Sequence, residues 1–281
     1  MIPQHSVNIG DSIHYSSYEE FLTDAMANGV RPRDMSSSRR YDAMGFSLTK
    51  TWDDAVELAT KGWEAGTKLV SEYQSKLLTT VCGGLTDQTM YLDLTTQYCY
   101  DMQSAIAGVP QCGVNFAPEG NRKLIRIMIN VGARASVSAE TMRNKAAIVS
   151  ALVLALELYH DVEIVVIRVD ATHTRKQSNS YQLSFTLKHA GEPLNTSLLA
   201  FAVGHPAMLR RMIFSWHELY LTPNAIAATG GNIYGWSIDI KDTSNFDIYI
   251  GAATEESHWD SPILAEEWIK KQLRLQGVEI G

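Results

Sequence analysis

The sequence predicts an α/β fold, in which a mainly parallel sheet is flanked by helices and preceded by a helical N-terminal extension. From residue 123 onward, strand and helix patterns alternate, which is typical of an α/β domain. Two apolar strands enclose one long helix there, and a connection of that length places the strands parallel to each other. We therefore divide the chain into a mostly helical extension, residues 1–120, and an α/β domain, residues 121–281.

Composition and charge exclude several classes of protein. The chain is 45% hydrophobic and 20% charged, as in an ordinary globular protein, and its net charge of −7 argues against binding nucleic acid over the whole surface. Three cysteines without metal-ligand spacing argue against a disulfide framework or a zinc site. The N-terminus lacks the pattern of a secretory signal, and the most apolar window, residues 146–158, is too short to cross a bilayer. We expect an intracellular protein with no membrane partner.

The N-terminal extension contains two helix patterns with recognisable starts. Ser17 with Glu20, and Thr51 with Asp54, both have the spacing of a capping box before an apolar stripe. Gly62 ends or kinks the second helix. Residues 83–122 are harder to assign: the pattern allows a strand or short helix near residue 92 and a helix from about 101 to 107.

The α/β domain begins with a clear strand, helix and strand. Residues 123–130 and 162–169 are apolar and rich in β-branched residues, which predicts strands buried on both faces. Between them, Ser138 is a suitable N-cap for a helix that is apolar over most of its circumference. That breadth of apolar residues predicts a largely buried helix.

The remaining elements follow in order. A strand from about residue 181 ends at a tight turn at 190–191, and helical segments lie on either side of a break at 204–206. Strand patterns occupy 232–241 and 245–253. A last helix has Ser261 as its cap, proline in its first turn and Gly277 as its stop.

The stretch "IRIMINVGARAS", residues 125–136, with the helix and strand that follow it, resembles the opening of a von Willebrand factor A-like domain. In that family a buried strand ends in a metal-binding loop of the form Asp-x-Ser-x-Ser, and a long alanine-rich helix and an apolar strand come next. The resemblance covers about half of the chain and implies a von Willebrand A-like fold within the Rossmann-like class.

The metal loop of that family is degenerate in this sequence. Its acidic position corresponds to Asn130 and its two hydroxyl positions to Gly132 and Arg134. A hard divalent cation prefers carboxylate and hydroxyl oxygens, and an arginine repels it. Asp170 and Thr172 follow the second strand and are expected to face the same crevice. We therefore expect a binding crevice at these five residues with no metal, no catalytic residue and no cofactor.

Basic residues suggest a second kind of contact. Four of them lie near the first strand and its following helix: Arg122, Lys123, Arg126 and Arg143. In "GHPAMLRR", His205 with Arg210 or Arg211 has the chemistry to hold a phosphate or carboxylate. The alternative is that His205 and Pro206 start a helix whose arginines pair with acids such as Glu218. The basic strand ends also allow single-stranded nucleic acid as a ligand.

The stretches "AFAVGHPAMLRRMIFSWHE", "TWDDAVELATKGWEAG" and "IAGVPQC" resemble uncharacterised proteins encoded by bacteriophages, which implies a viral origin. Since no complete catalytic set is apparent, our leading hypothesis is a non-enzymatic module that binds a protein partner or its own copies. The alternative is an accessory factor that binds single-stranded nucleic acid in viral transcription or replication. The expected location is the host cytoplasm, with association with the virion as a variant.

Overall fold

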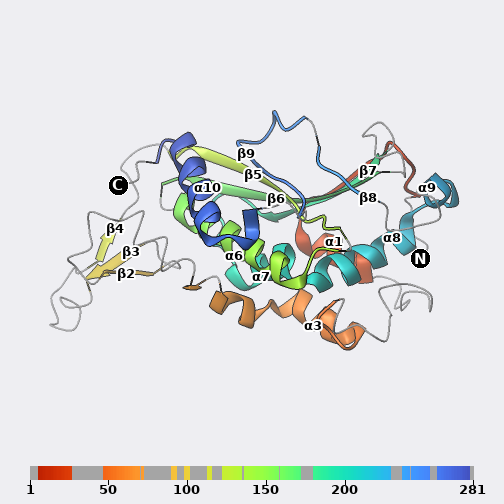
Figure 1. The fold of residues 1–281 in the computed structure, drawn as a ribbon, viewed down its shortest axis with the longest axis horizontal. Helices are drawn as coiled ribbons and strands as arrows, with labels where there is room; N and C mark the ends of the chain where they lie inside the picture. The colour runs from red at the N-terminus through yellow and green to blue at the C-terminus, as the bar shows by residue number, and fades with distance from the viewer. Residues whose placement is uncertain are drawn as a thin grey trace.

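The computed structural model describes residues 6–26, 47–69, 71–72, 90–93, 98–101, 113–115, 122–134, 136–157, 159–171, 180–228, 236–240, 242–253 and 258–278. Within them the main body is a mixed sheet with helices packed on one face (Figure 1). This arrangement confirms the predicted α/β class.

The main sheet has six strands in the order β1-β7-β6-β5-β9, with β8 beside the end of β6. Strands β5, β6 and β9 are parallel, and β7 runs antiparallel to β6. At the far edge β1 runs parallel to β7. The bounds are β1 Ser12–Tyr15, β5 Leu124–Asn130, β6 Asp161–Ala171, β7 Ser180–Lys188, β8 Trp236–Ser237 and β9 Ile248–Ile250.

The predicted crossover is the centre of this fold. Strand β5 leads through α6 (Ala139–Glu157) to β6, and the two strands pair in parallel from Leu124 opposite Asp161 to Asn130 opposite Ile167. The cap is also as predicted, since the Ser138 hydroxyl accepts a hydrogen bond of 3.0 Å from the Thr141 amide. Most of α6 is buried, as its apolar circumference requires.

The helices form one layer against one face of the sheet (Figure 1). Apolar side chains of β5, β6 and β7 on that face pack against α6, α7, α8 and α1, and α3 covers these helices from outside. The bounds are α1 Tyr18–Met26, α3 Trp52–Lys61, α7 Thr196–Gly204, π-helix η2 Met208–Ile213, α8 Phe214–Tyr220, α9 Pro223–Ala228, 3₁₀-helix η3 His258–Asp260 and α10 Pro262–Leu275. None of the described helices is long and apolar enough to cross a membrane.

The opposite face of the sheet has a thinner cover. A second small core of Met128, Val165, Ile167 and Val169 packs there against Ile238, Ile240, Phe246 and Tyr249. Among the described residues, no helix packs on this side, and the cover comes from the chain between β8 and β9. We call this side of the sheet the open face.

Some elements differ from the predictions. The predicted strand at 232–241 contains only the two-residue β8, because residues 238–240 leave the sheet edge and pack over the open face. The prediction of a helix from about residue 101 is wrong at its start, because Asp101 is the last residue of β3 (Tyr98–Asp101). Strand β3 pairs with β2 (Met90–Asp93) and with β4 (Gly113–Asn115). Alternating aromatic residues favour a strand there. The rest of that predicted helix lies outside the described residues.

Candidate functional site

The structure brings the ends of β5 and β6 together, as the crossover predicted, but their two polar residues lie on opposite faces of the sheet. Asn130 is opposite Ile167, whose side chain belongs to the core of the open face. Asp170 lies three residues further along β6, so its side chain lies on the helix face. Both side chains are fully buried. These strand ends therefore hold two separate buried polar clusters, one on each face of the sheet.

The first cluster surrounds the Asn130 side chain. Its amide nitrogen donates to the Ile238 carbonyl at 2.9 Å, to Asp239 Oδ1 at 3.1 Å and to the Tyr249 hydroxyl at 3.2 Å, while its Oδ1 accepts from the Gly132 amide at 2.9 Å. Asp239 Oδ1 also accepts from Tyr249 at 2.7 Å and from the Ala252 amide at 2.8 Å. Asn130 therefore anchors the chain that crosses the open face.

Lys145 of α6 reaches the same strand ends from the helix face. Its Nζ donates to the carbonyls of Asn130 and Gly251, each at 2.6 Å, and lies 5.7 Å from the centre of the Trp259 ring. Burial lowers the pKa of Lys145 to about 7, although the Asp239 charge acts to raise it. A buried amine joins α6 to the ends of β5 and β9.

The second cluster contains Asp170, Arg168, His217 and Tyr181, all buried on the helix face. Arg168 forms a two-point ion pair with Asp170, including a bond of 2.7 Å from Nε to Oδ2. Burial and the Arg168 charge hold the pKa of His217 well below its ordinary value, so its Nε2, 3.4 Å from Asp170 Oδ2, belongs to a neutral ring. Both ring nitrogens of His217 and the Tyr181 hydroxyl lack a hydrogen-bond partner among the described residues.

The remaining residues of the predicted crevice contribute no ligand. An added Cβ on Gly132 would lie 1.8 Å from the Ser237 hydroxyl and 2.8 Å from Arg168 Nη1, so a side chain at this position would have to displace them. Arg134 is exposed, beyond the end of the strand. Thr172 lies outside the described residues.

These residues do not fit the metal that a von Willebrand A-like loop implies. The side-chain oxygen of Asn130 accepts a backbone hydrogen bond, the Lys145 nitrogen lies on the Asn130 carbonyl, and Arg168 approaches Gly132. Two basic groups beside the loop would repel a divalent ion. Among the described residues there is also no group of three or more His, Cys, Asp or Glu side chains placed to hold a metal.

The basic residues near β5 form ion pairs. Arg122 Nε lies 3.1 Å from Asp161, Lys123 lies 3.5 Å from Asp247, and Arg126 lies 3.4 Å from Glu163. Arg122 also donates to the carbonyls of Glu157 and His160. Arg143 is half-buried on α6. The acidic partners reduce the positive charge that this region would offer to a phosphate backbone.

The "GHPAMLRR" residues lie inside the helix layer. His205 caps the end of α7, accepts a hydrogen bond of 3.1 Å from the Ala207 amide and packs on Phe201 and Trp63. Arg210 donates to the Val137 carbonyl at 3.1 Å. Arg211 donates to the hydroxyls of Ser47 and Thr49 at 3.2 and 2.9 Å. The two arginines are about 4% and 3% exposed, so they connect parts of the protein to one another.

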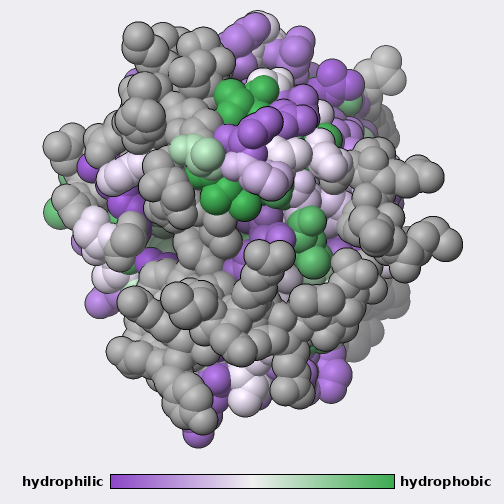
Figure 2. All heavy atoms as spheres, turned by 90° about the vertical axis from the view of Figure 1, so that its right-hand side faces the viewer, coloured by the Kyte–Doolittle hydropathy of each residue, from purple (hydrophilic) through white to green (hydrophobic). Residues whose placement is uncertain are grey.

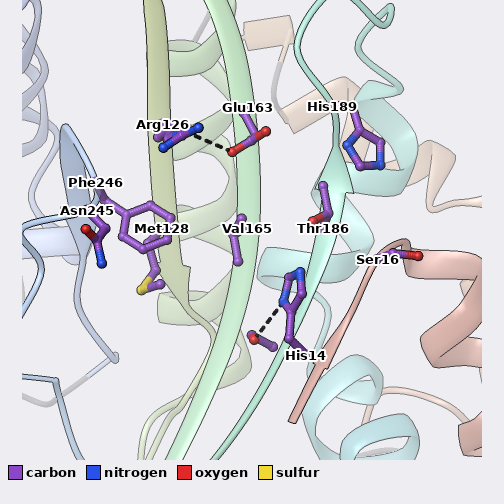
Figure 3. Close-up of a pocket in the computed structure, with 11 residues that line it drawn as sticks. His14, Ser16, Arg126, Met128, Glu163, Val165, Thr186, His189, Asn245 and Phe246 are labelled. Atoms are coloured by element: carbon purple, nitrogen blue, oxygen red, sulfur yellow. Dashed lines mark hydrogen bonds and ion pairs between the residues drawn. The ribbon is translucent and has the colours of Figure 1, made fainter. Parts of the chain in front are cut away.

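A shallow trough of about 390 Å³ crosses the open face (Figure 3). In it the Arg126–Glu163 ion pair lies beside Met128 and Val165, and the His14 ring contacts the Ser184 hydroxyl at 3.0 Å. Its polar lining comes from four strands and three loops: His14, Ser16, Arg126, Glu163, Ser184, Thr186, His189 and Asn245, with Phe246 at one side. His14, Arg126, His189 and Asn245 are exposed in it, unlike the polar groups at the strand ends, whereas Ser184 and Thr186 at its floor are buried.

A family model for a domain of unknown function, DUF7192, matches residues 9–280. The chain belongs to the DUF7192 family. No curated protein and no solved structure matches this DUF7192 chain.

Sequence reasoning identified one residue of the trough in the DUF7192 domain, Arg126, and missed the others. The signal available was the alternation in β7, where Gln182, Ser184 and Thr186 place polar side chains on one face and Leu183 and Phe185 place apolar ones on the other. That pattern marks a strand with one uncovered face. It does not say which strands lie beside it.

Proposed function

We propose that this DUF7192 protein is a non-enzymatic interaction module, encoded by a bacteriophage, that binds a protein partner through the open face of its sheet. The proposal rests on one observation: among the described residues, helices cover β5 and β6 on only one face of the sheet. Parallel strands are normally covered on both faces. Among the described residues, helices cover one face, while on the other the chain between β8 and β9 leaves the trough accessible.

The chemistry of the trough suits another protein better than a phosphate backbone. Its formal charges are one arginine and one glutamate, which pair with each other. Its histidine, hydroxyl and amide side chains offer both donors and acceptors, as the polar part of a protein interface does. Phe246 and Met128 add a small apolar contribution. The balance of charge argues for a polar, uncharged contact surface.

The non-enzymatic part of the proposal rests on the strand ends, where α/β sheets usually bind ligands. There the side chains with catalytic chemistry are engaged inside the protein: Lys145 with two carbonyls, and Asp170 with Arg168. Neither group is accessible to a substrate, since both residues are at most 2% exposed. This supports a protein that acts by binding at its surface and not by catalysis at the strand ends.

Figure 2 looks at the right-hand end of the molecule in Figure 1. The described residues on that end are small groups of hydrophobic side chains set among hydrophilic ones.

Photo-cross-linking tests the proposal. A photoreactive amino acid replaces Asn245 in the trough or, as the control, the exposed Glu267 on α10, on the helix side. We expect a discrete cross-linked product in infected cells from position 245 and none from position 267. A product containing the same chain would identify a second copy as the partner. Equal labelling from both positions would contradict the proposed surface.

An oligonucleotide titration separates the proposal from nucleic-acid binding. We expect no binding even at low salt, because the basic residues near β5 have acidic partners. Tight, salt-sensitive binding would contradict the proposal. The proposed location is the host cytoplasm, and mass spectrometry of purified particles would show whether the protein is also present in the virion.

A further inference from the structure

Lys145 joins three elements at one point. Its Nζ, which extends from α6, donates to the carbonyl of Asn130 at the end of β5 and to that of Gly251 just after β9. The next residues along both segments are also joined, because the Ala253 amide donates to the Gly132 carbonyl at 2.8 Å. The amine therefore lies where two parallel strands end side by side.

Several groups around this nitrogen favour a cation, although burial outweighs them and lowers its pKa to about 7. Two carbonyl oxygens face it, the Trp259 ring lies on another side, and Asp239 is the acid whose charge acts on it. An aromatic face and carbonyl oxygens both attract a positive charge. Lys145 is 2% exposed, and a buried ammonium is tolerated only where such groups replace water.

We propose that the Lys145 ammonium is a built-in replacement for an exchangeable cation, so that the strand ends of this protein are held together without a metal ion. The von Willebrand A-like resemblance implies a divalent ion near this loop, and the residues at 130, 132 and 134 do not fit one. The side chain of α6 supplies a nitrogen that is covalently attached and cannot leave the site, and this nitrogen is positively charged below its pKa of about 7. Chelators therefore leave the arrangement of the strand ends unchanged.

Chemical rescue tests the replacement. Lys145→Ala removes the three outer methylene groups and the nitrogen, which together have the size of n-propylammonium. The measurement is the melting temperature at a pH one unit below the value of about 7 for Lys145, where the amine is protonated. We expect a fall of roughly 6–12 °C, because one or more charge-assisted hydrogen bonds are lost. Added n-propylammonium should recover at least half of it.

Three controls make the rescue specific. The wild-type protein and the core variant Leu152→Ala should gain nothing from n-propylammonium, and 1-propanol should not rescue Lys145→Ala. Magnesium and calcium should not raise the melting temperature of the wild-type protein, and a chelator should not lower it. Absent rescue, equal rescue by 1-propanol, or a rise with magnesium or calcium would overturn the proposal.

If Lys145→Ala does not fold, Lys145→Met tests whether the ammonium holds the strand ends together, because methionine keeps most of the side-chain volume without the charge. Hydrogen exchange should then be at least about tenfold faster at the amides of Ala252 and Ala253. Exchange in β7, which is separated from β5 by β6 in the sheet, should be unchanged. Unaltered protection at Ala252 and Ala253 would show that the ammonium does not hold the strand ends.

Discussion

Two buried tyrosines, Tyr18 and Tyr181, differ in what surrounds the hydroxyl. The Tyr18 hydroxyl donates to the Ala59 carbonyl at 3.0 Å, whereas the Tyr181 hydroxyl has no partner among the described residues. A buried polar group without a partner costs free energy, and one with a partner contributes about 1 kcal/mol. We expect Tyr18→Phe to lower the free energy of unfolding by about 1 kcal/mol and Tyr181→Phe to leave it unchanged or raise it. Urea denaturation measures both, and an equal loss in the two variants would contradict this reading.

His205 makes stability depend on pH. Burial lowers its pKa to about 4 in the folded protein, below the ordinary value of 6.5 that the unfolded chain retains. Between these values the unfolded state binds the extra proton, so stability falls as pH decreases from about 6.5 to about 4. Over this range the free energy of unfolding falls by roughly 3 kcal/mol in total. His205→Asn keeps an acceptor for the Ala207 amide and should flatten the profile. Denaturation midpoints measured across this range provide the test, and an unchanged slope would contradict it.

At the scale of the element, the start of α3 depends on one local motif. The Thr51 hydroxyl accepts from the Asp54 amide at 3.1 Å, and the Asp54 carboxylate accepts from the Thr51 amide at 2.9 Å. This capping box supports the first turn of α3, together with the packing of Ala55 and Trp52 against the core. Thr51→Ala should cost about 1 kcal/mol and Thr51→Ser much less. Thermal denaturation compares the two variants, and equal losses would show that the hydroxyl is not the cause.

The elements that the sequence predicted correctly are those whose signals are local. Ser138 and Ser261 cap their helices as expected, and the apolar strands on either side of α6 pair in parallel. The two-residue β8 and the aromatic strand β3 were misjudged, because their length depends on which strand lies beside them. Local sequence patterns indicate turns and helix caps, but they do not indicate which neighbouring strands determine where a strand begins and ends.

At the candidate site, too, the sequence predicted local features but not contacts between distant parts of the chain. The sequence predicted that the segments of Asn130 and Asp170 end side by side, and they do. It did not predict that Lys145 and Arg168 fill the positions beside them, because those contacts depend on how far long side chains reach across the fold. Nor did it identify the trough, whose lining comes from residues as distant in sequence as His14 and Asn245.

At the scale of the whole molecule, the two faces of the sheet differ in what covers them. On one side the main core buries the apolar residues of β5, β6 and β7 under helices. On the other, a cluster of four strand residues is covered by the chain between β8 and β9, and the polar trough remains beside it (Figure 1, Figure 3). Stability therefore depends mainly on the helix side, and surface contacts of the open face can change with little effect on the fold.

Charge reversal at the trough should therefore separate binding from folding. Arg126 is exposed and pairs with Glu163, 3.4 Å away, in a contact that contributes little to stability in water. Arg126→Glu should change the free energy of unfolding by less than about 1 kcal/mol. It should nevertheless abolish the cross-link from position 245, because two like charges then face the partner. Glu267→Lys on α10 reverses a charge on the helix side and should keep the cross-link. If Arg126→Glu keeps the cross-link as Glu267→Lys does, the partner does not contact the trough.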